Sequence, residues 1–278
     1  MFRNRKSQKF TKLFFEVLFM YEGGWFMHFS SYFDRQRTED FIMFSPSHWI
    51  ALSIITLVCI LFYSLRFEIR TDVKLRQSVR LLLIIILMFS ETGLQIWYLS
   101  QSVWQSSSSL PLELCGITLL LSVIMLITRS RTLYSFLYFA GIGGAFIALI
   151  TPNLVYPFPH FRFLLFFIAH GGIVLASLYM TWIEGYRPTW KSLLFTMLGL
   201  NIVAACVWVA NYILGSNYMF LSHKPSTYSV LDYFGPYPYY LLVEELFAFI
   251  VFLLMYLIFF WMPEQRKSRR KRISRIPY

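Results

Sequence analysis

The chain has 278 residues, of which 57% are hydrophobic and only 14% are charged, with a formal net charge of +11. Soluble globular domains hold about a quarter charged residues, so this composition excludes a soluble domain of this size. The apolar residues fall into long blocks, which is typical of membrane-spanning helices. We therefore expect an all-α fold, a polytopic transmembrane helical bundle.

Residues 1–45 precede the first clear span and form an N-terminal extension that opens with a basic cluster, MFRNRKSQK. The apolar stretch 13–29 is interrupted by acidic residues and a glycine pair, so it is either a short eighth span or an interfacial amphipathic anchor. A third alternative concerns the gene, because the Glu-Gly-Gly run at 22–24 can be encoded by a sequence that resembles a ribosome-binding site. Met27 follows shortly after that run, and we predict that translation starts there.

Seven apolar blocks are long enough to cross a bilayer, since a span needs about 20 residues at 1.5 Å rise per residue. Lipid offers no partner for an open backbone, so each block is expected to be helical. Residues 46–262 then form a seven-helix transmembrane domain, and a basic tail follows at 263–278. The predicted spans are 46–65, 79–99, 110–127, 133–150, 163–183, 192–214 and 239–262.

Lysine and arginine gather in alternate connections between the predicted spans. The first connection holds four of them, and the second, SQSVWQSSSS, holds none. Arg129 and Arg131 lie in the third connection, and Arg187 and Lys191 lie in the fifth. Because positively charged loops stay on the cytoplasmic side, the odd connections and the C-terminus are predicted to be cytoplasmic. The basic tail is expected to contact anionic lipid headgroups and not nucleic acid.

Two ionisable residues lie well inside predicted spans, where charged groups are costly and mark functional candidates. Glu91 lies in the second span and His170 in the fifth, each about two turns from the nearer end. A buried carboxylate must pair, accept hydrogen bonds or become protonated. His170 precedes Gly171 and Gly172, so a hydrogen bond between closely packed helices is the structural alternative. We favour a role in a polar cavity for both residues.

Cys115 lies near the start of the third span, on the same outer side of the predicted bundle. The three cysteines form neither a disulfide framework nor a metal-ligand pattern, and no cofactor-binding motif is present. A cysteine nucleophile needs a base, typically histidine, and His170 matches Cys115 in depth to within about two turns. Anchoring at the headgroup level explains the polar residues at helix ends equally well. The candidate substrate-binding residues within or beside the spans are His48, Glu91, Gln95, Glu113, Asn211 and Glu244.

The sixth connection, GSNYMFLSHKPSTYSVLDYFGPYPYY, is long and mixes aromatic, proline and small polar residues. Such a loop in a compact protein is typical of a lid or a binding loop, although tyrosines at this level also form the ordinary interfacial belt. Asn217, Tyr218 and Lys224 are the candidate ligand-contacting residues here. A solvated lysine is an equal explanation for Lys224.

Several strings in this order resemble the bacterial YwaF-like integral membrane proteins: FSPSHWIAL, LPLELCG, FIAHGG, SNYMFLSHKP and LDYFGPYPYY. The match covers roughly Met27 to the last predicted span. That family is more remotely similar to the eukaryotic transmembrane protein 164 group, described as cysteine-dependent acyltransferases that act on ether lysophospholipids. The resemblance implies a bacterial cell membrane location, with Cys115 as the acyl-accepting nucleophile and His170 as its base.

Two functions therefore stand as hypotheses. The first is a phospholipid/lysophospholipid acyltransferase with an outward-facing intramembrane site, with membrane lipids as its partners and no metal or other cofactor. The alternative is a transporter or small-molecule binding protein that uses Glu91 and His170. A structural or accessory membrane protein is a third, plainer interpretation, and the sequence does not indicate an oligomeric state.

Overall fold

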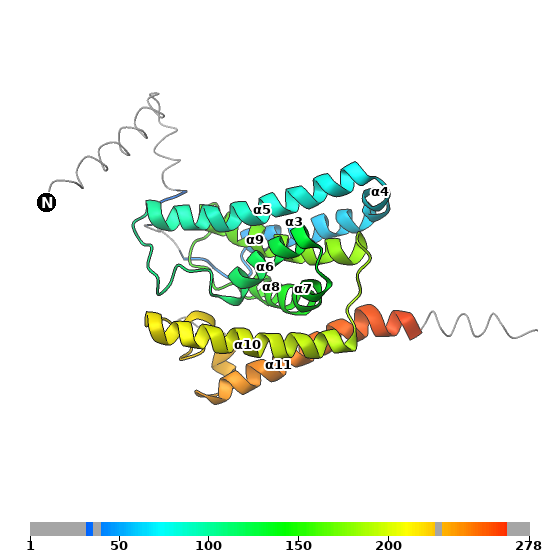
Figure 1. Ribbon diagram of the computed structural model, residues 1–278. Helices are drawn as coiled ribbons and strands as arrows, with labels where there is room; N and C mark the ends of the chain where they lie inside the picture. Colours follow the sequence, from blue (N-terminus) through cyan, green and yellow to red (C-terminus); the bar gives the residue numbers. More distant parts are fainter. Residues whose placement is uncertain (1–31, 36–39, 226–229, 266–278) are drawn as a thin grey trace, which may run out of the picture.

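The computed structural model describes residues 32–35, 40–225 and 230–265, and the regular structure of that part is entirely helical (Figure 1). The predicted segment 13–29, the proposed start at Met27 and the tail from 266 onward lie outside the described residues. Six helices in the described part are long and apolar enough to cross a membrane. This confirms the prediction of a multi-pass, all-α membrane protein.

The helices are joined by connections of different lengths, and the described part includes two π-helical segments. The second long helix begins at Val73, earlier than the predicted Val79. Asp72 caps this helix, because its Oδ1 accepts hydrogen bonds from the N–H groups of Lys74 and Leu75. The elements are α3 Pro46–Ser64, α4 Arg66–Thr71, α5 Val73–Ser100, α6 Leu114–Thr128, α7 Arg131–Phe136, η1 Leu137–Gly141, α8 Ile142–Ile150, α9 Phe161–Trp182, α10 Trp190–Leu214, η2 Tyr218–Phe220, η3 Val230–Phe234, α11 Tyr239–Tyr256 and η4 Leu257–Trp261.

The third predicted span is shorter than expected, so seven full spans are not confirmed. Helix α6 has 15 residues and begins at Leu114, not at residue 110. Pro111 disfavours helical backbone at the residue before it and lacks an N–H. The residues before α6 form turns instead, in which Ser109 N–H donates to Gln105 O and Leu112 N–H donates to Leu110 O. Residues 110–113 therefore belong to a folded connection.

Helix α9 lies at the centre of the bundle and packs against α3, α5, α6 and α8. More than half of its membrane-length window is buried, whereas His48 is the one fully buried residue of α3. Gly172 allows the close approach of α5, because a Cβ there would lie 3.0 Å from Leu87 Cδ2. Helices α10 and α11 form a further layer, in which α10 packs on α7 and α11 on α8 (Figure 1).

The segment before α3 is hydrogen-bonded to the connection between α8 and α9, to the start of α9 and to the end of α5. Phe41 N–H donates to Val155 O at 3.1 Å, Phe161 N–H donates to Tyr32 O at 2.8 Å, and Trp97 Nε1 donates to Phe33 O at 2.8 Å. The described part of the N-terminal extension is thus held at one end of the bundle. We call this end, where α5 finishes and α6, α9 and α11 begin, the Glu113 end, and the opposite end the Arg187 end.

Candidate functional site

A cavity of about 210 Å³ lies between α5, α6 and α9, toward the Glu113 end, and we call it the polar cavity. Five residues that the sequence singled out line it together, although they come from three helices and one connection. They are Glu91, Gln95, Glu113, Cys115 and His170.

His170 presents one free ring nitrogen in this cavity. Its Nδ1 lies 2.7 Å from Phe166 O, and a carbonyl only accepts, so Nδ1 carries the proton. In the neutral imidazole, Nε2 is then the acceptor. The ring also lies against Phe166, with centroids 4.1 Å apart. His170 is buried, and these contacts fix both its tautomer and its orientation.

Cys115 lies in the first turn of α6 and is a half-buried free thiol. The next residue, Gly116, packs directly on the backbone of Pro111, because a Cβ there would lie 3.0 Å from three Pro111 backbone atoms. This close turn places the start of α6 beside the cavity. Cys59 on α3 and Cys206 on α10 do not line it.

Glu91 is held by a chain of hydrogen bonds that closes one wall of the cavity. Gln95 Nε2 donates to Glu91 Oε1 and to Ser109 O, both at 2.8 Å. Gln95 Oε1 accepts from Trp104 Nε1 at 3.0 Å. The amide of Gln95 thereby joins α5 to the connection before α6, and the carboxylate of Glu91 has a fixed partner within its own helix.

Glu113, Asn211 and Tyr218 join the loop after α10 to the cavity wall. Glu113 Oε2 accepts from Met219 N–H at 2.9 Å. Asn211 is buried, and its side chain donates to Tyr218 O at 2.9 Å and accepts from Tyr218 N–H at 2.8 Å. The Tyr218 hydroxyl accepts from Leu110 N–H and donates to Ser106 O, both at 2.9 Å, and burial raises its pKa. Asn211 and Tyr218 thus support the cavity without lining it.

His48 lies elsewhere and joins two helices. Its Nδ1 accepts from Phe44 N–H at 2.9 Å, so its Nε2 donates to Leu149 O at 2.8 Å. The ring is fully buried, with both nitrogens occupied by the backbone. This arrangement ties the start of α3 to the end of α8.

Three other candidates also lie outside the lining of the polar cavity. Asn217 Nδ2 donates to His223 O at 2.7 Å and stabilises its own loop. Lys224 Nζ lies 3.5 Å from Asp232 O. Glu244 is half-buried on α11, which contributes nothing to the cavity lining.

Arg162 also lines the polar cavity, although the sequence analysis did not single it out. Its guanidinium carbon lies 5.0 Å from the ring centroid of Trp97, 4.8 Å from that of Tyr98 and 5.8 Å from that of Tyr156. These contacts hold a positive charge at the cavity by cation–π attraction. The sequence feature that could have indicated this role is an arginine among aromatic residues at the start of a predicted span.

Among the described residues, no group of three or more His, Cys, Asp or Glu side chains is placed to hold a metal ion. An uncharacterized protein from Treponema pallidum (strain Nichols) is 26% identical over 225 residues, which cover 79% of this chain and 90% of the relative. No solved structure matches the chain. The model of the TMEM164 family matches residues 43–256, a range that includes the whole lining of the polar cavity, and the chain therefore belongs to the TMEM164 family.

Proposed function

We propose that this protein is a cysteine-dependent acyltransferase that moves an acyl chain from a phospholipid to a lysophospholipid. The observation that carries the proposal is the presence of Cys115 and His170 in one cavity, with the proton of His170 fixed on Nδ1 by Phe166 O. A histidine held in this way has its second nitrogen ready to take the thiol proton.

The proposed reaction has two steps that mirror one another. His170 Nε2 takes the proton of Cys115, and the thiolate attacks the ester carbonyl of the donor lipid. The ester C–O bond breaks, the leaving alkoxide takes the proton from His170, and an acyl thioester remains on Cys115. The hydroxyl of a lysophospholipid then gives its proton to His170 and attacks the thioester, and the thiolate that leaves recovers the proton.

The other cavity residues suit a phospholipid headgroup. Arg162 offers a planar guanidinium, which pairs well with a phosphate, and its aromatic neighbours keep it in place. Glu91 and Glu113 add carboxylates at the same cavity, and these suit an amine-bearing headgroup. We assign Arg162 to the phosphate, and the two carboxylates to the remainder of the headgroup or to the incoming hydroxyl.

The distribution of lysine and arginine supports an orientation for the site. Arg129, Arg131 and Lys191 lie with Arg187 at the Arg187 end, and positively charged connections stay in the cytoplasm. We propose that the Arg187 end and the C-terminus are cytoplasmic, that the polar cavity lies toward the outer face, and that the chain is a YwaF-like bacterial member of its family.

Reconstitution in lipid bilayers with a labelled lysophospholipid tests the proposal. Wild type is expected to transfer acyl chains, and Cys115→Ala and His170→Ala are each expected to lower the rate at least about 100-fold, because base-assisted proton transfer contributes about 10²–10⁴-fold. Cys59→Ala is the matched control, since Cys59 is also half-buried but lies on α3. An acylated Cys115 peptide in mass spectrometry would identify the nucleophile. Absence of transfer across several donor and acceptor lipids would overturn the proposal.

A second candidate function is ligand binding or transport. It is favoured by the hydrogen-bonded Glu91–Gln95 pair in the cavity wall, because intramembrane carboxylates also serve proton relays and cationic ligands. Under this function Glu91→Gln abolishes uptake or binding of a cation, while Cys115→Ala leaves it unchanged. The reverse ranking of the two variants supports the acyltransferase.

A further inference from the structure

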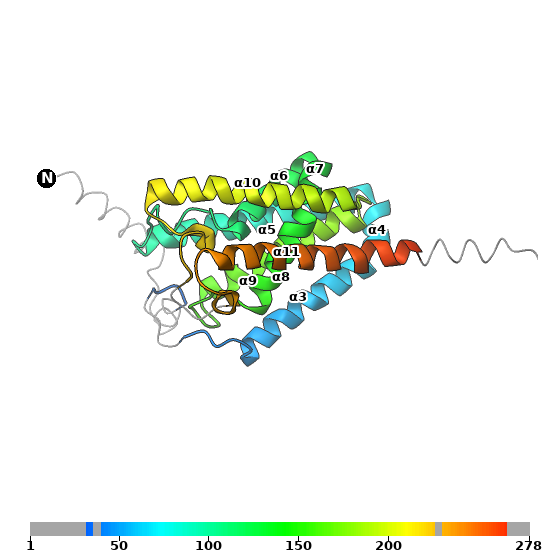
Figure 2. The same cartoon turned by 90° about the horizontal axis from the view of Figure 1, so that it is seen from below.

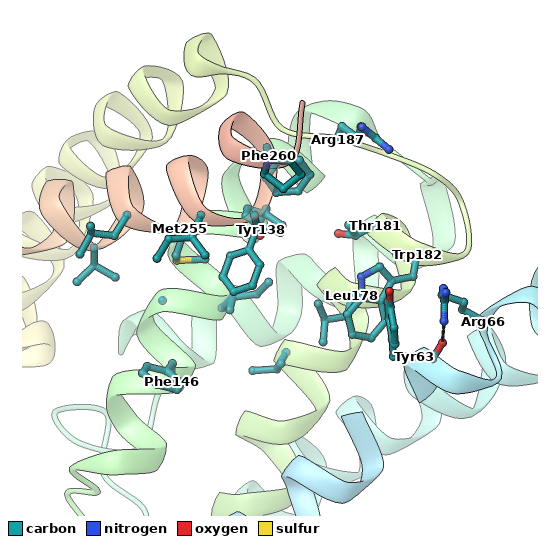
Figure 3. Close-up of a pocket in the computed structure, with 18 of the residues that line it drawn as sticks. Tyr63, Arg66, Tyr138, Phe146, Leu178, Thr181, Trp182, Arg187, Met255 and Phe260 are labelled. Carbon is teal, nitrogen blue, oxygen red and sulfur yellow. Dashed lines mark hydrogen bonds between the residues drawn. The ribbon is translucent and has the colours of Figure 1, made fainter. Parts of the chain in front are cut away.

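A second cavity, unrelated to the catalytic proposal, runs along the outside of the bundle, and we call it the apolar groove. It has a volume of about 1780 Å³ and is bordered by α3, α4, α8, α9 and α11 (Figure 3). None of its lining residues lines the polar cavity. Figure 2 shows α3 lying at an angle to α11, with α8 and α9 behind the space between them.

The length and the apolar lining of the groove suit acyl chains. Its walls are mainly aliphatic and aromatic, including Phe146, Leu178 and Met255 (Figure 3). Lining residues on the last helix extend from 247 to 264, which corresponds to about 25 Å at 1.5 Å per residue. This length approaches the hydrocarbon thickness of a bilayer, about 30 Å. A volume above the roughly 300–1,000 Å³ of small-molecule pockets also points to a larger apolar occupant.

Positive charge is concentrated where the groove reaches the Arg187 end. Arg66 and Arg70 come from α4 and Arg187 from the connection after α9, and Glu264 is the one acidic residue in the lining. The Arg66 guanidinium donates to Tyr63 O and lies 3.7 Å from the Tyr63 ring centroid. Labelled side chains in Figure 3 place Thr181 and Trp182 between Arg66 and Arg187.

The connection after α9 is shaped to admit one of these arginines. Gly185 has φ +76°, a backbone conformation that residues with a side chain rarely adopt. A Cβ there would lie 3.4 Å from Arg70 Nη2. The guanidinium of Arg70 therefore lies over the Gly185 backbone. Three arginines from two separate elements are thus gathered at one end of an apolar groove.

From this juxtaposition we infer that the apolar groove binds one anionic phospholipid, with its phosphate on Arg66, Arg70 and Arg187 and its acyl chains along α9 and α11. Guanidinium groups bind phosphate through paired N–H donors. Membrane-surface arginines each attract anionic lipids, and the single carboxylate Glu264 offsets only part of this charge. The groove lies apart from Cys115, so the bound lipid is a resident ligand and not the acyl donor of the proposed reaction.

Native mass spectrometry of the purified full chain tests this inference, with phosphatidylglycerol and phosphatidylcholine of the same acyl chains as probes. Wild type is expected to bind phosphatidylglycerol about tenfold more tightly, a difference of about 1.4 kcal/mol. The combined variant Arg66→Gln, Arg70→Gln and Arg187→Gln is expected to lose most of this preference. If wild type binds the two lipids with equal affinity, the inference is overturned, whatever the variants show.

A charge-matched control separates the groove from general surface charge. Arg129, Arg131 and Lys191 lie at the same end but do not line the groove. Replacing these three by glutamine removes the same charge and is expected to preserve the preference. A preference lost equally in both triple variants, or a dimer whose formation excludes lipid, would also overturn the inference. Because binding and not acyl transfer is measured, failure here leaves the proposed catalytic function untouched.

Discussion

Met219 donates its backbone N–H to Glu113 Oε2 at 2.9 Å, across a sequence separation of 106 residues. Glu113 is the N-cap residue of α6, two positions before Cys115. Met219 has φ +57° within the short η2 segment, a conformation that is uncommon for a residue with a side chain. One carboxylate therefore couples the loop after α10 to the helix that carries the proposed nucleophile.

We expect Glu113→Ala to loosen this loop without unfolding the bundle. A typical hydrogen bond contributes about 1 kcal/mol net, so the amide exchange of Met219 should rise about fivefold. Hydrogen–deuterium exchange of the 216–223 peptide measures the effect. Glu113→Gln keeps a carbonyl acceptor and should show a smaller increase. An unchanged exchange rate in Glu113→Ala would show that the contact does not order the loop.

Asn211→Ala is expected to destabilise the protein by about 2–3 kcal/mol, because it leaves the buried N–H and C=O of Tyr218 without their partners. Thermal unfolding in detergent measures the change. Asn201→Ala is the comparison on the same helix, because it removes side-chain bonds to Met197 O and Glu245 but leaves no buried backbone N–H without a partner. It is expected to destabilise the protein less than Asn211→Ala. Equal effects of the two variants would contradict the role assigned to Asn211.

His160 is expected to make stability fall as the pH is lowered from neutral. It is buried outside the spans, and burial lowers its pKa below the usual value, although the contact with Asp34 O acts in the opposite direction. The unfolded chain then takes up a proton more readily than the folded chain. The contribution of His160 is complete above the unfolded pKa of about 6.5 and is lost as the pH falls below it.

His160→Asn tests this dependence, because asparagine keeps a side-chain acceptor for Arg162 N–H at the N-cap of α9 but does not titrate. The fall in thermal stability between pH 7.5 and pH 5 should be shallower in this variant than in wild type. Identical profiles for wild type and His160→Asn would refute the assignment.

The membrane class and most of the helices could be predicted from the sequence because long apolar blocks have few alternatives in lipid. The predicted start of the third span was wrong, because hydropathy does not show that Pro111 disfavours helical backbone in this stretch, and α6 begins only at Leu114. Similarly, α5 extends beyond its apolar block because Asp72 caps it. Helix ends depend on local hydrogen bonds, and a hydropathy pattern averages over these.

The candidate site was predicted in part for a different reason. Depth along a span could be counted, and this placed Glu91, Cys115 and His170 at comparable levels; the helices that carry them do border one cavity. The sequence does not show which helices are neighbours in the bundle. His48 was therefore grouped with these residues, although its partner is Leu149 O, 101 residues away. Arg162 was missed because its role depends on aromatic rings from two other segments.

Arg162→Gln is expected to raise the KM for the lysophospholipid about tenfold or more while changing kcat less, if the guanidinium binds the phosphate in the ground state and the transition state alike. Arg162→Lys keeps the charge but loses the paired donors and should give an intermediate KM. Steady-state acyl transfer in bilayers, with substrate expressed as mole fraction, measures both constants. A lowered kcat with unchanged KM would move Arg162 from binding to the chemical step.

Gly116→Ala is expected to disturb the position of the proposed nucleophile. The added Cβ would lie 3.0 Å from the Cα, C and O atoms of Pro111, and backbone atoms cannot move aside as a flexible side chain can. Overpacking of this kind costs about 1–3 kcal/mol, and relief requires the start of α6, with Cys115, to shift. We expect a lower unfolding temperature and reduced reactivity of Cys115 toward an acyl-like alkylating probe.

Gly144→Ala supplies the comparison for this variant. Gly144 is also helical and borders α6, but a Cβ there would meet Leu114 Cδ2 at 3.5 Å, which is ordinary contact with a side chain. Its thermal stability and thiol reactivity should match those of wild type. If Gly116→Ala also behaves as wild type, the backbone before α6 is free to adjust, and the close turn at Pro111 does not set the position of Cys115. If only Gly116→Ala loses reactivity, the LPLELCG string specifies the location of the thiol through backbone packing, and its glycine is required because no side chain fits between two turns of the chain.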